Sequence, residues 1–237
     1  MSTSFSPVKN ARITGALYLV IIVLGLLSEL VVRQSLVIAG NAGATAANIL
    51  QSETLFRFSF FADSIVFLSD AAVAALLYLL LRPVNNTVAL VAAAFRLTQT
   101  AVLALNLLNQ HAALLLLTGA SYSPLEPEQR NALAYLMMER HSHGYDLGLL
   151  FFGIHCLLIG YLILKSTFLP KVLGLLLMAA SFAYLVGSYV HFLAPALVPT
   201  VAPIYAVAIV AEVGLCGWLL VRGVDAKRWA SLAASTA

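Results

Sequence analysis

The side chains that could do chemistry in this chain are charged or polar residues set inside long apolar stretches. Asp70, Arg96, His155 and Glu212 each lie near the middle of such a stretch. If the stretches cross a membrane, a charge at that depth is costly and normally faces other helices, where it finds a partner. We therefore predict that Arg96 forms an ion pair with Asp70 or with Glu212.

A second group of polar side chains lies nearer to one end of the stretches. Glu29, Asp63 and Asn106 belong to it, and Asp63 precedes Asp70 by seven residues, which places both on nearly the same face of a helix. Polar stripes that converge in one half of a membrane predict a cavity that opens outward, with Arg96 at its floor. The ligand-binding residues that we predict are Arg96, Asp70, Glu212, His155, Asp63, Asn106 and Glu29.

Each of these side chains also has a purely structural interpretation. A buried pair such as Arg96 with Asp70 can fix the register of two helices, and Asn106 can simply hydrogen-bond between helices. His141-Ser142-His143 offers two imidazoles but no third or fourth metal ligand nearby in the sequence. We therefore predict no metal site and no cofactor.

Composition determines the class of protein that must position these residues. Of the 237 residues, 62% are hydrophobic and only 10% are charged, whereas about 25% are charged in soluble domains. The sequence therefore predicts an all-α integral membrane protein. It contains no basic patch interleaved with exposed aromatic residues, so nucleic acid is not a predicted partner.

The apolar stretches predict six transmembrane helices in a single domain, residues 1–237. The length of each stretch is sufficient for a hydrocarbon core of about 30 Å at a rise of about 1.5 Å per residue. The expected spans are about Arg12–Val32, Leu55–Leu81, Ala89–Thr118, Gly144–Leu164, Val172–Leu193 and Val201–Val221.

Two connections between the spans are long. Residues 34–54 contain Gly40-Asn41-Ala42-Gly43 and a small-residue segment compatible with a short helix. Residues 120–143 contain prolines and acidic residues typical of a helix start. We predict a separate short outer amphipathic helix from Ser123-Pro124 to about Arg140, lying along the membrane surface or capping the bundle.

The distribution of lysine and arginine predicts the orientation of the chain. Lysine and arginine residues in the connections and near the ends of the spans divide eight to four between the two sides, with Arg96 left inside the membrane. Because cytoplasmic loops carry the excess of basic residues, we expect both termini in the cytoplasm and both long connections outside. The larger set is Lys9, Arg12, Arg82, Lys165, Lys171, Arg222, Lys227 and Arg228, and the smaller set is Arg33, Arg57, Arg130 and Arg140.

Several motifs resemble one protein family over nearly the whole chain. They are Ser28-Glu29-Leu30-Val31-Val32-Arg33, Phe95-Arg96-Leu97, His141-Ser142-His143-Gly144-Tyr145, Phe151-Phe152-Gly153-Ile154-His155-Cys156 and the run from Lys165 to Gly174. The sequence resembles a bacterial six-span membrane protein family of unknown function, domain of unknown function 4386. The resemblance implies six helices and a bacterial cytoplasmic membrane location, and it supplies no reaction.

Three hypotheses about function remain open. The first is a protein whose outward cavity binds or moves a small polar or amphiphilic molecule, or a lipid, with Arg96 as an anion anchor. The second is a membrane-embedded metal-dependent hydrolase that uses His141, His155, Asp70 and Glu212. The third is a structural or partner-binding membrane protein in which the buried charges serve assembly. We favour the first, while enzymatic activity and oligomeric state stay undecided.

Overall fold

A computed structural model of the chain describes residues 6–122 and 124–235. Within these ranges, six helical segments are long and apolar enough to cross a membrane: Pro7–Leu36, Glu53–Leu81, Asn86–Thr118, Pro127–Lys165, Lys171–Leu193 and Pro195–Val221. The all-α, six-span architecture predicted from the sequence is therefore confirmed.

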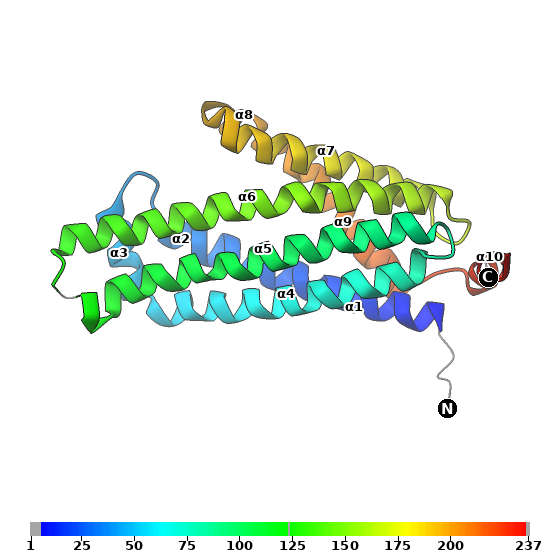
Figure 1. The fold of residues 1–237 in the computed structure, drawn as a ribbon, viewed down its shortest axis with the longest axis horizontal. Coiled ribbons are helices and arrows are strands. Elements are labelled where there is room, and N and C mark those ends of the chain that lie inside the picture. Colours follow the sequence, from blue (N-terminus) through cyan, green and yellow to red (C-terminus); the bar gives the residue numbers. More distant parts are fainter. Residues whose placement is uncertain (1–5, 123, 236–237) are drawn as a thin grey trace. The chain divides into compact units, whose positions relative to one another are not determined.

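Figure 1 shows the helices in order along the chain. The first span comprises α1 (Pro7–Leu26), a π-helical segment η1 (Leu27–Arg33) and α2 (Gln34–Leu36). The short helix α3 (Ala42–Gln51) forms in the first long connection, where the Asn41 side chain accepts a hydrogen bond from the Ala44 amide and caps it. The next two spans are α4 (Glu53–Leu81) and α5 (Asn86–Thr118).

The second half of the chain begins with a 3₁₀ turn, η2 (Ala120–Tyr122), and continues with α6 (Pro127–Lys165) and α7 (Lys171–Leu193). Prolines shape the entry to the last span, which passes through η3 (Pro195–Leu197), α8 (Val198–Val201) and η4 (Ala202–Ile204) before α9 (Tyr205–Val221). The helix α10 (Ala226–Ser235) follows.

The fourth span differs from its prediction. The amphipathic helix expected to end near Arg140 forms, but it continues without a break through Gly144 to Lys165 as one helix of 39 residues. No proline interrupts residues 141–144, so nothing in the backbone ends the helix there. The helix begins at Pro127 rather than at Ser123-Pro124, and Ser123 lies outside the described residues.

The helices contribute to two compact units. Unit 1 comprises Met1–Val20, Ser69–Thr100 and Asp146–Ala237, and unit 2 comprises Ile21–Leu68 and Ala101–Tyr145. Helices α1, α4, α5 and α6 therefore supply residues to both units. The single domain over residues 1–237 stays a prediction.

Close helix contacts in unit 1 depend on glycine. A Cβ atom added to Gly15 in α1 would lie 2.5 Å from the backbone nitrogen of Leu220 in α9. The thiol of Cys216 donates to the Gly15 carbonyl oxygen over 3.4 Å. Gly160 in α6 and Gly174 in α7 also lie close together. A Cβ atom added to either glycine would lie 2.7 Å from the carbonyl oxygen of the other. Such small-residue contacts are the usual means by which membrane helices approach closely.

Unit 2 has an apolar core between its helices. Buried residues from η1 to α6 form one cluster, which joins α3 to the longer helices: Val32, Leu36, Ala46, Ile49, Phe56, Ala113, Leu114, Leu117, Ala134 and Met138. The helical part of the second long connection therefore packs against this core through Ala134 and Met138, which are buried. Leu133 and Leu136 on the same helix are exposed.

We predict that Gly15→Ala destabilises the protein, because the added methyl group meets backbone atoms that cannot rotate away. Overpacking of this kind costs about 1–3 kcal/mol. Gly25→Ala in the same helix is the matched control, since nothing lies within 4 Å of its added Cβ. Thermal unfolding in detergent should show a lower midpoint for Gly15→Ala only, and equal midpoints for the two variants would contradict the prediction.

Candidate functional site

Arg96 lies at the centre of a buried polar cluster in unit 1. Its side chain is 0% exposed, and its Nη2 and Nε donate to Asp70 Oδ1 over 2.5 and 3.0 Å. Its Nη1 donates to the Tyr18 hydroxyl over 2.7 Å. The guanidinium also lies over the aromatic rings of Tyr18 and Phe152, 4.7 and 5.2 Å from their centroids. The ion pair predicted from the sequence is present, and its partner is Asp70.

Both oxygens of the Asp70 carboxylate are occupied. Oδ1 accepts from Arg96, and Oδ2 lies 2.5 Å from the hydroxyl of Thr100, which stands one helical turn after Arg96. A hydroxyl has one proton, and the charged oxygen is its stronger acceptor. Asp70 is therefore held in place from two positions of α5.

The hydrogen bonds of His155 fix its tautomer. Nδ1 lies 2.9 Å from the carbonyl oxygen of Ala92, which can only accept, so Nδ1 carries the proton. Nε2 then accepts from Arg96 Nη1 over 3.1 Å. Because both ring nitrogens are engaged within the protein, neither is available to bind a metal or to act as a base.

Glu212 has a different partner from the one considered in the sequence. Its carboxylate accepts a hydrogen bond from the hydroxyl of Tyr184, and no ion pair joins it to Arg96 among the described residues. Tyr184 packs edge-on against Phe152, with ring centroids 5.2 Å apart. The hydrogen-bond partner of Glu212 is thus Tyr184 rather than Arg96.

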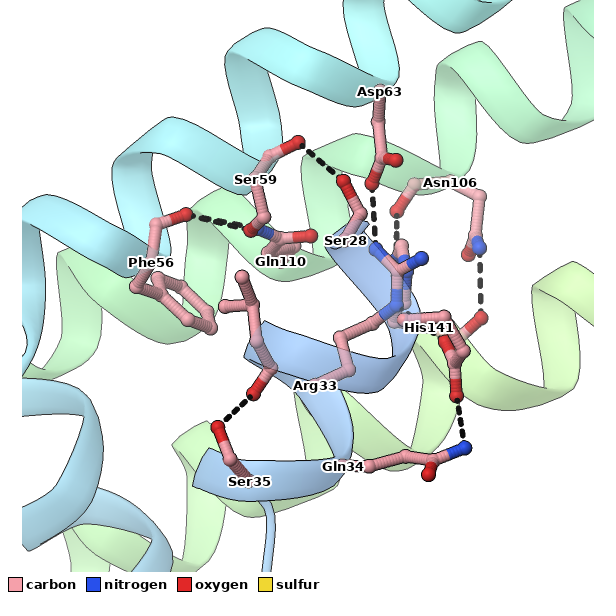
Figure 2. A network of polar contacts seen from close by, with 12 residues as sticks. Ser28, Arg33, Gln34, Ser35, Phe56, Ser59, Asp63, Asn106, Gln110 and His141 are labelled. Atoms are coloured by element: carbon pink, nitrogen blue, oxygen red, sulfur yellow. Dashed lines mark hydrogen bonds and ion pairs between the residues drawn. The ribbon is translucent and has the colours of Figure 1, made fainter. Parts of the chain in front are cut away.

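Unit 2 contains a second buried arginine, which the sequence analysis placed in a loop. Arg33 Nη1 donates to Asp63 Oδ2 over 2.6 Å, and its Nε donates to Glu29 Oε2 over 2.7 Å. Figure 2 shows this guanidinium pointing toward Asp63. The first span extends through Leu36, beyond the predicted end at Val32, so Arg33 belongs to the helix and should not have been counted as a loop charge.

The residues Leu27–Arg33, at the end of which Arg33 lies, form a π-helix. A π-helix adds a residue to the turn and so shifts the face on which the following side chains lie. The spacing of Glu29 and Arg33, four residues apart, was the sequence signal for their contact. Nothing in the sequence signalled the wider turn.

Hydrogen bonds extend the unit 2 network onto α4 and α5. Gln110 Nε2 donates to Ser59 Oγ over 2.7 Å and to the Phe56 carbonyl oxygen over 3.2 Å. The Ser28 hydroxyl donates to the carbonyl oxygen of Ser59. Gln110 Oε1 is buried and has no hydrogen-bond donor among the described residues.

Asn106 and His141 connect α5 to α6 in the same network (Figure 2). Asn106 Nδ2 donates to the His141 carbonyl oxygen over 2.7 Å, and His141 Nδ1 lies 3.2 Å from the Asn106 carbonyl oxygen. Nδ1 therefore carries the proton and Nε2 is an acceptor. That Nε2 atom is buried and also lacks a donor within the described part of the chain.

A cavity of about 420 Å³ lies beside this network in unit 2. Phe56, Phe60 and Leu114 give it apolar walls, and Gln110 belongs to both the wall and the network. The exposed Arg57 and His111 complete the lining. Arg57 is paired with Glu53 over 2.7 Å, so its charge is compensated.

The predicted site residues thus fall into separate groups. Asp70, Arg96 and His155 meet in unit 1, and Glu29, Asp63 and Asn106 belong to the unit 2 network. Residues that sequence reasoning did not select are Arg33, Thr100 and Tyr184. Within residues 6–122 and 124–235, no three His, Cys, Asp or Glu side chains are close enough to hold a metal ion, so the hydrolase hypothesis gains no support.

Six apolar helices with ion-paired charges between them define a multi-pass membrane protein. Residues 13–223 match the family "Domain of unknown function (DUF4386)", so the chain belongs to that family. An uncharacterized protein of Archaeoglobus fulgidus is 32% identical over 128 residues, which are 54% of this chain and 64% of the relative. The match thus spans less than two thirds of that relative, and no solved structure matches.

We predict that Arg96→Ala and Asp70→Asn each destabilise the protein strongly. Removing one partner of a buried ion pair typically costs about 3–5 kcal/mol, because the other charge is left unpaired. Chemical unfolding in detergent measures the effect, with Arg140→Ala as the control, since Arg140 is exposed. Combining Asp70→Asn with Arg96→Gln should recover part of the loss, and single variants as stable as the control would contradict the prediction.

Proposed function

We propose that this protein binds a small amphiphilic molecule within the membrane, at the cavity of unit 2. The observation that carries the proposal concerns Gln110, because this side chain both lines the cavity and belongs to the buried network. Its Oε1 atom is a buried acceptor that has no donor among the residues that the structure describes. Leaving such a group unsatisfied costs about 1–3 kcal/mol, which a bound donor would recover.

The polar head of the ligand is inferred from the balance of groups in the network. Glu29 and Asp63 carry two negative charges against one positive charge on Arg33. Gln110 Oε1 and His141 Nε2 are both acceptors for which the described part of the chain supplies no donor. A network with surplus acceptors and a net negative charge favours a head that donates hydrogen bonds and is cationic, such as an alkylammonium group.

The apolar part of the ligand is inferred from the cavity. A volume of about 420 Å³ lies within the range of about 300–1,000 Å³ that is typical of small-molecule sites. Phe56, Phe60 and Leu114 offer apolar surface for a short alkyl chain. Arg57 at the cavity does not oppose a cationic head, because Glu53 neutralises it.

We predict that decylamine raises the thermal unfolding midpoint of the full chain in detergent, whereas decanoate does not. The two probes share a chain length and differ in the charge of the head. A ligand at ten times its Kd stabilises the folded state by about 1.4 kcal/mol. Gln110→Leu should abolish the shift by removing the acceptor.

Gln99→Leu is the matched control for this experiment, since Gln99 Oε1 is likewise buried without a donor but belongs to unit 1. It should keep the response to decylamine. Equal shifts with decylamine and decanoate, or a full response in Gln110→Leu, would exclude the proposed site.

A structural function of the Arg96 cluster is the second candidate, favoured by one specific observation. The guanidinium is fully buried, and its three nitrogens donate to side chains of the same unit. An anionic ligand at Arg96 would have to displace Asp70 or Tyr18. This supports assembly of the helices, rather than ligand binding, as the function of Asp70, Arg96 and His155.

We also propose that the protein lies in a bacterial cytoplasmic membrane with both termini in the cytoplasm. The basic residues near the ends of the spans, which divide eight to four in the sequence, support this orientation. In that orientation the start of α4 and the end of α5, which line the cavity, lie at the outer side.

Cysteine labelling tests the orientation directly, because the two native cysteines are buried. We expect a membrane-impermeant maleimide to label Ser121→Cys in intact cells. Ser231→Cys, at an exposed position of α10, should react only after permeabilisation. The reverse pattern would overturn the orientation.

A further inference from the structure

The helix α10 is attached to unit 1 at specific points. The Trp229 indole Nε1 donates to the carbonyl oxygen of Leu80 at the end of α4, over 2.8 Å. Arg228 Nη1 donates to the Thr167 carbonyl oxygen, and the Asp225 amide donates to that of Phe168. The helix is thus held against the end of α4 and the connection between α6 and α7.

The turn before α10 fixes its direction. Gly223 adopts a φ of +68°, a left-handed conformation that favours glycine after the end of a helix. Asp225 then caps α10, since its Oδ1 accepts from the amides of Lys227 and Arg228, each over 3.1 Å. The chain therefore ends one span and starts a short helix within a few residues.

This end of unit 1 has a large excess of positive charge. A Cβ atom added to Gly223 would lie 3.4 Å from a side-chain carbon of Val8, so the start of α1 lies at the same end as α10. The described residues at this end include eight basic residues and one acidic residue, Asp225. The Asp225 Oδ2 atom lies 3.3 Å from Arg228 Nε. The basic residues are Lys9, Arg12, Arg82, Lys165, Lys171, Arg222, Lys227 and Arg228.

A hollow of about 360 Å³ lies between α10 and the turn that joins α4 to α5. Residues 82–86 of the turn line it, together with Trp229 and Ala233. The Asn85 and Asn86 amide oxygens are engaged with the Val88 amide and the Tyr78 hydroxyl. Within the described residues, their amide nitrogens and the Arg82 guanidinium make no hydrogen bond, so the polar side chains of the hollow offer donors.

We propose that this hollow binds the phosphate of an anionic phospholipid headgroup. Arginine and amide donors match phosphate oxygens, and none of the described residues that line the hollow carries a carboxylate to oppose them. A lipid fits better than free phosphate because the hollow adjoins the end of a transmembrane helix and has Pro83, Val84 and the Trp229 ring in its wall. Tryptophan is typical of the headgroup level. This site is independent of the ligand proposed for unit 2.

Native mass spectrometry of the detergent-solubilised full chain tests the proposal. Phosphatidylglycerol and phosphatidylcholine with identical acyl chains are titrated against the wild type, Arg82→Gln and Arg140→Gln. We expect the wild type to prefer phosphatidylglycerol, and Arg82→Gln to bind it roughly fivefold more weakly, as expected for the loss of one basic residue near the headgroups. Arg140→Gln, an exposed change in another part of the chain, should bind like the wild type.

Asn86→Ala provides a second variant that removes a donor of the hollow without changing charge, and it should also weaken phosphatidylglycerol binding. Equal binding of the two lipids by the wild type would overturn the proposal, as would unchanged binding in Arg82→Gln. Displacement of phosphatidylglycerol by an equal concentration of inorganic phosphate would show a free-anion site instead of a lipid site.

Discussion

The structure depends on one constraint: a charge inside a bilayer must be matched by another group of the protein. Helix α4 carries two such charges, Asp63 and Asp70, and each is paired with an arginine from a different span. Water is absent from the hydrocarbon core, so these pairs have no solvated alternative. The pairs therefore specify which helices are neighbours in each unit more strictly than apolar packing could.

The two pairs differ in how completely their surroundings satisfy them. Around Arg96, hydroxyl, imidazole and carboxylate groups match the guanidinium, and aromatic rings cover it. Around Arg33, carboxylates and unpaired acceptors are in excess. A matched cluster is typical of structural reinforcement, whereas an unmatched one stores free energy that a ligand can release. This difference is why we propose a structural function for the Arg96 cluster and ligand binding beside the Arg33 cluster.

Most of the fold could be predicted from the sequence, because six apolar stretches separated by turns determine six spans. An ion pair of Arg96 with Asp70 or Glu212 was also predicted, since residue depth can be counted from the ends of the spans, and the structure gives Asp70 as the partner. Other features could not be found this way. The π-helical turn that carries Arg33 and the continuity of α6 through Gly144 depend on local packing. A Cβ at Gly144 would overlap the Asn106 amide, a contact that spacing alone does not reveal.

The partner of Glu212 shows a further limit of counting depth. Glu212 and Arg96 were predicted at matching depths, yet the Glu212 carboxylate accepts a hydrogen bond from Tyr184 and Arg96 pairs with Asp70. Depth along a span gives one coordinate of a side chain. The direction in which the side chain faces is set by tertiary packing, which the sequence of a single helix does not contain.

The length of α6 has a consequence for the surface of the protein. A helix of 39 residues is about 58 Å long, almost twice the thickness of a hydrocarbon core of about 30 Å. About half of it must therefore stand in the headgroup region or in water. The segment from Pro127 to Arg140 contains four of the six charged residues of α6 and is the part suited to that environment. One helix thus runs without a break from the headgroup region or water into the interior of the membrane.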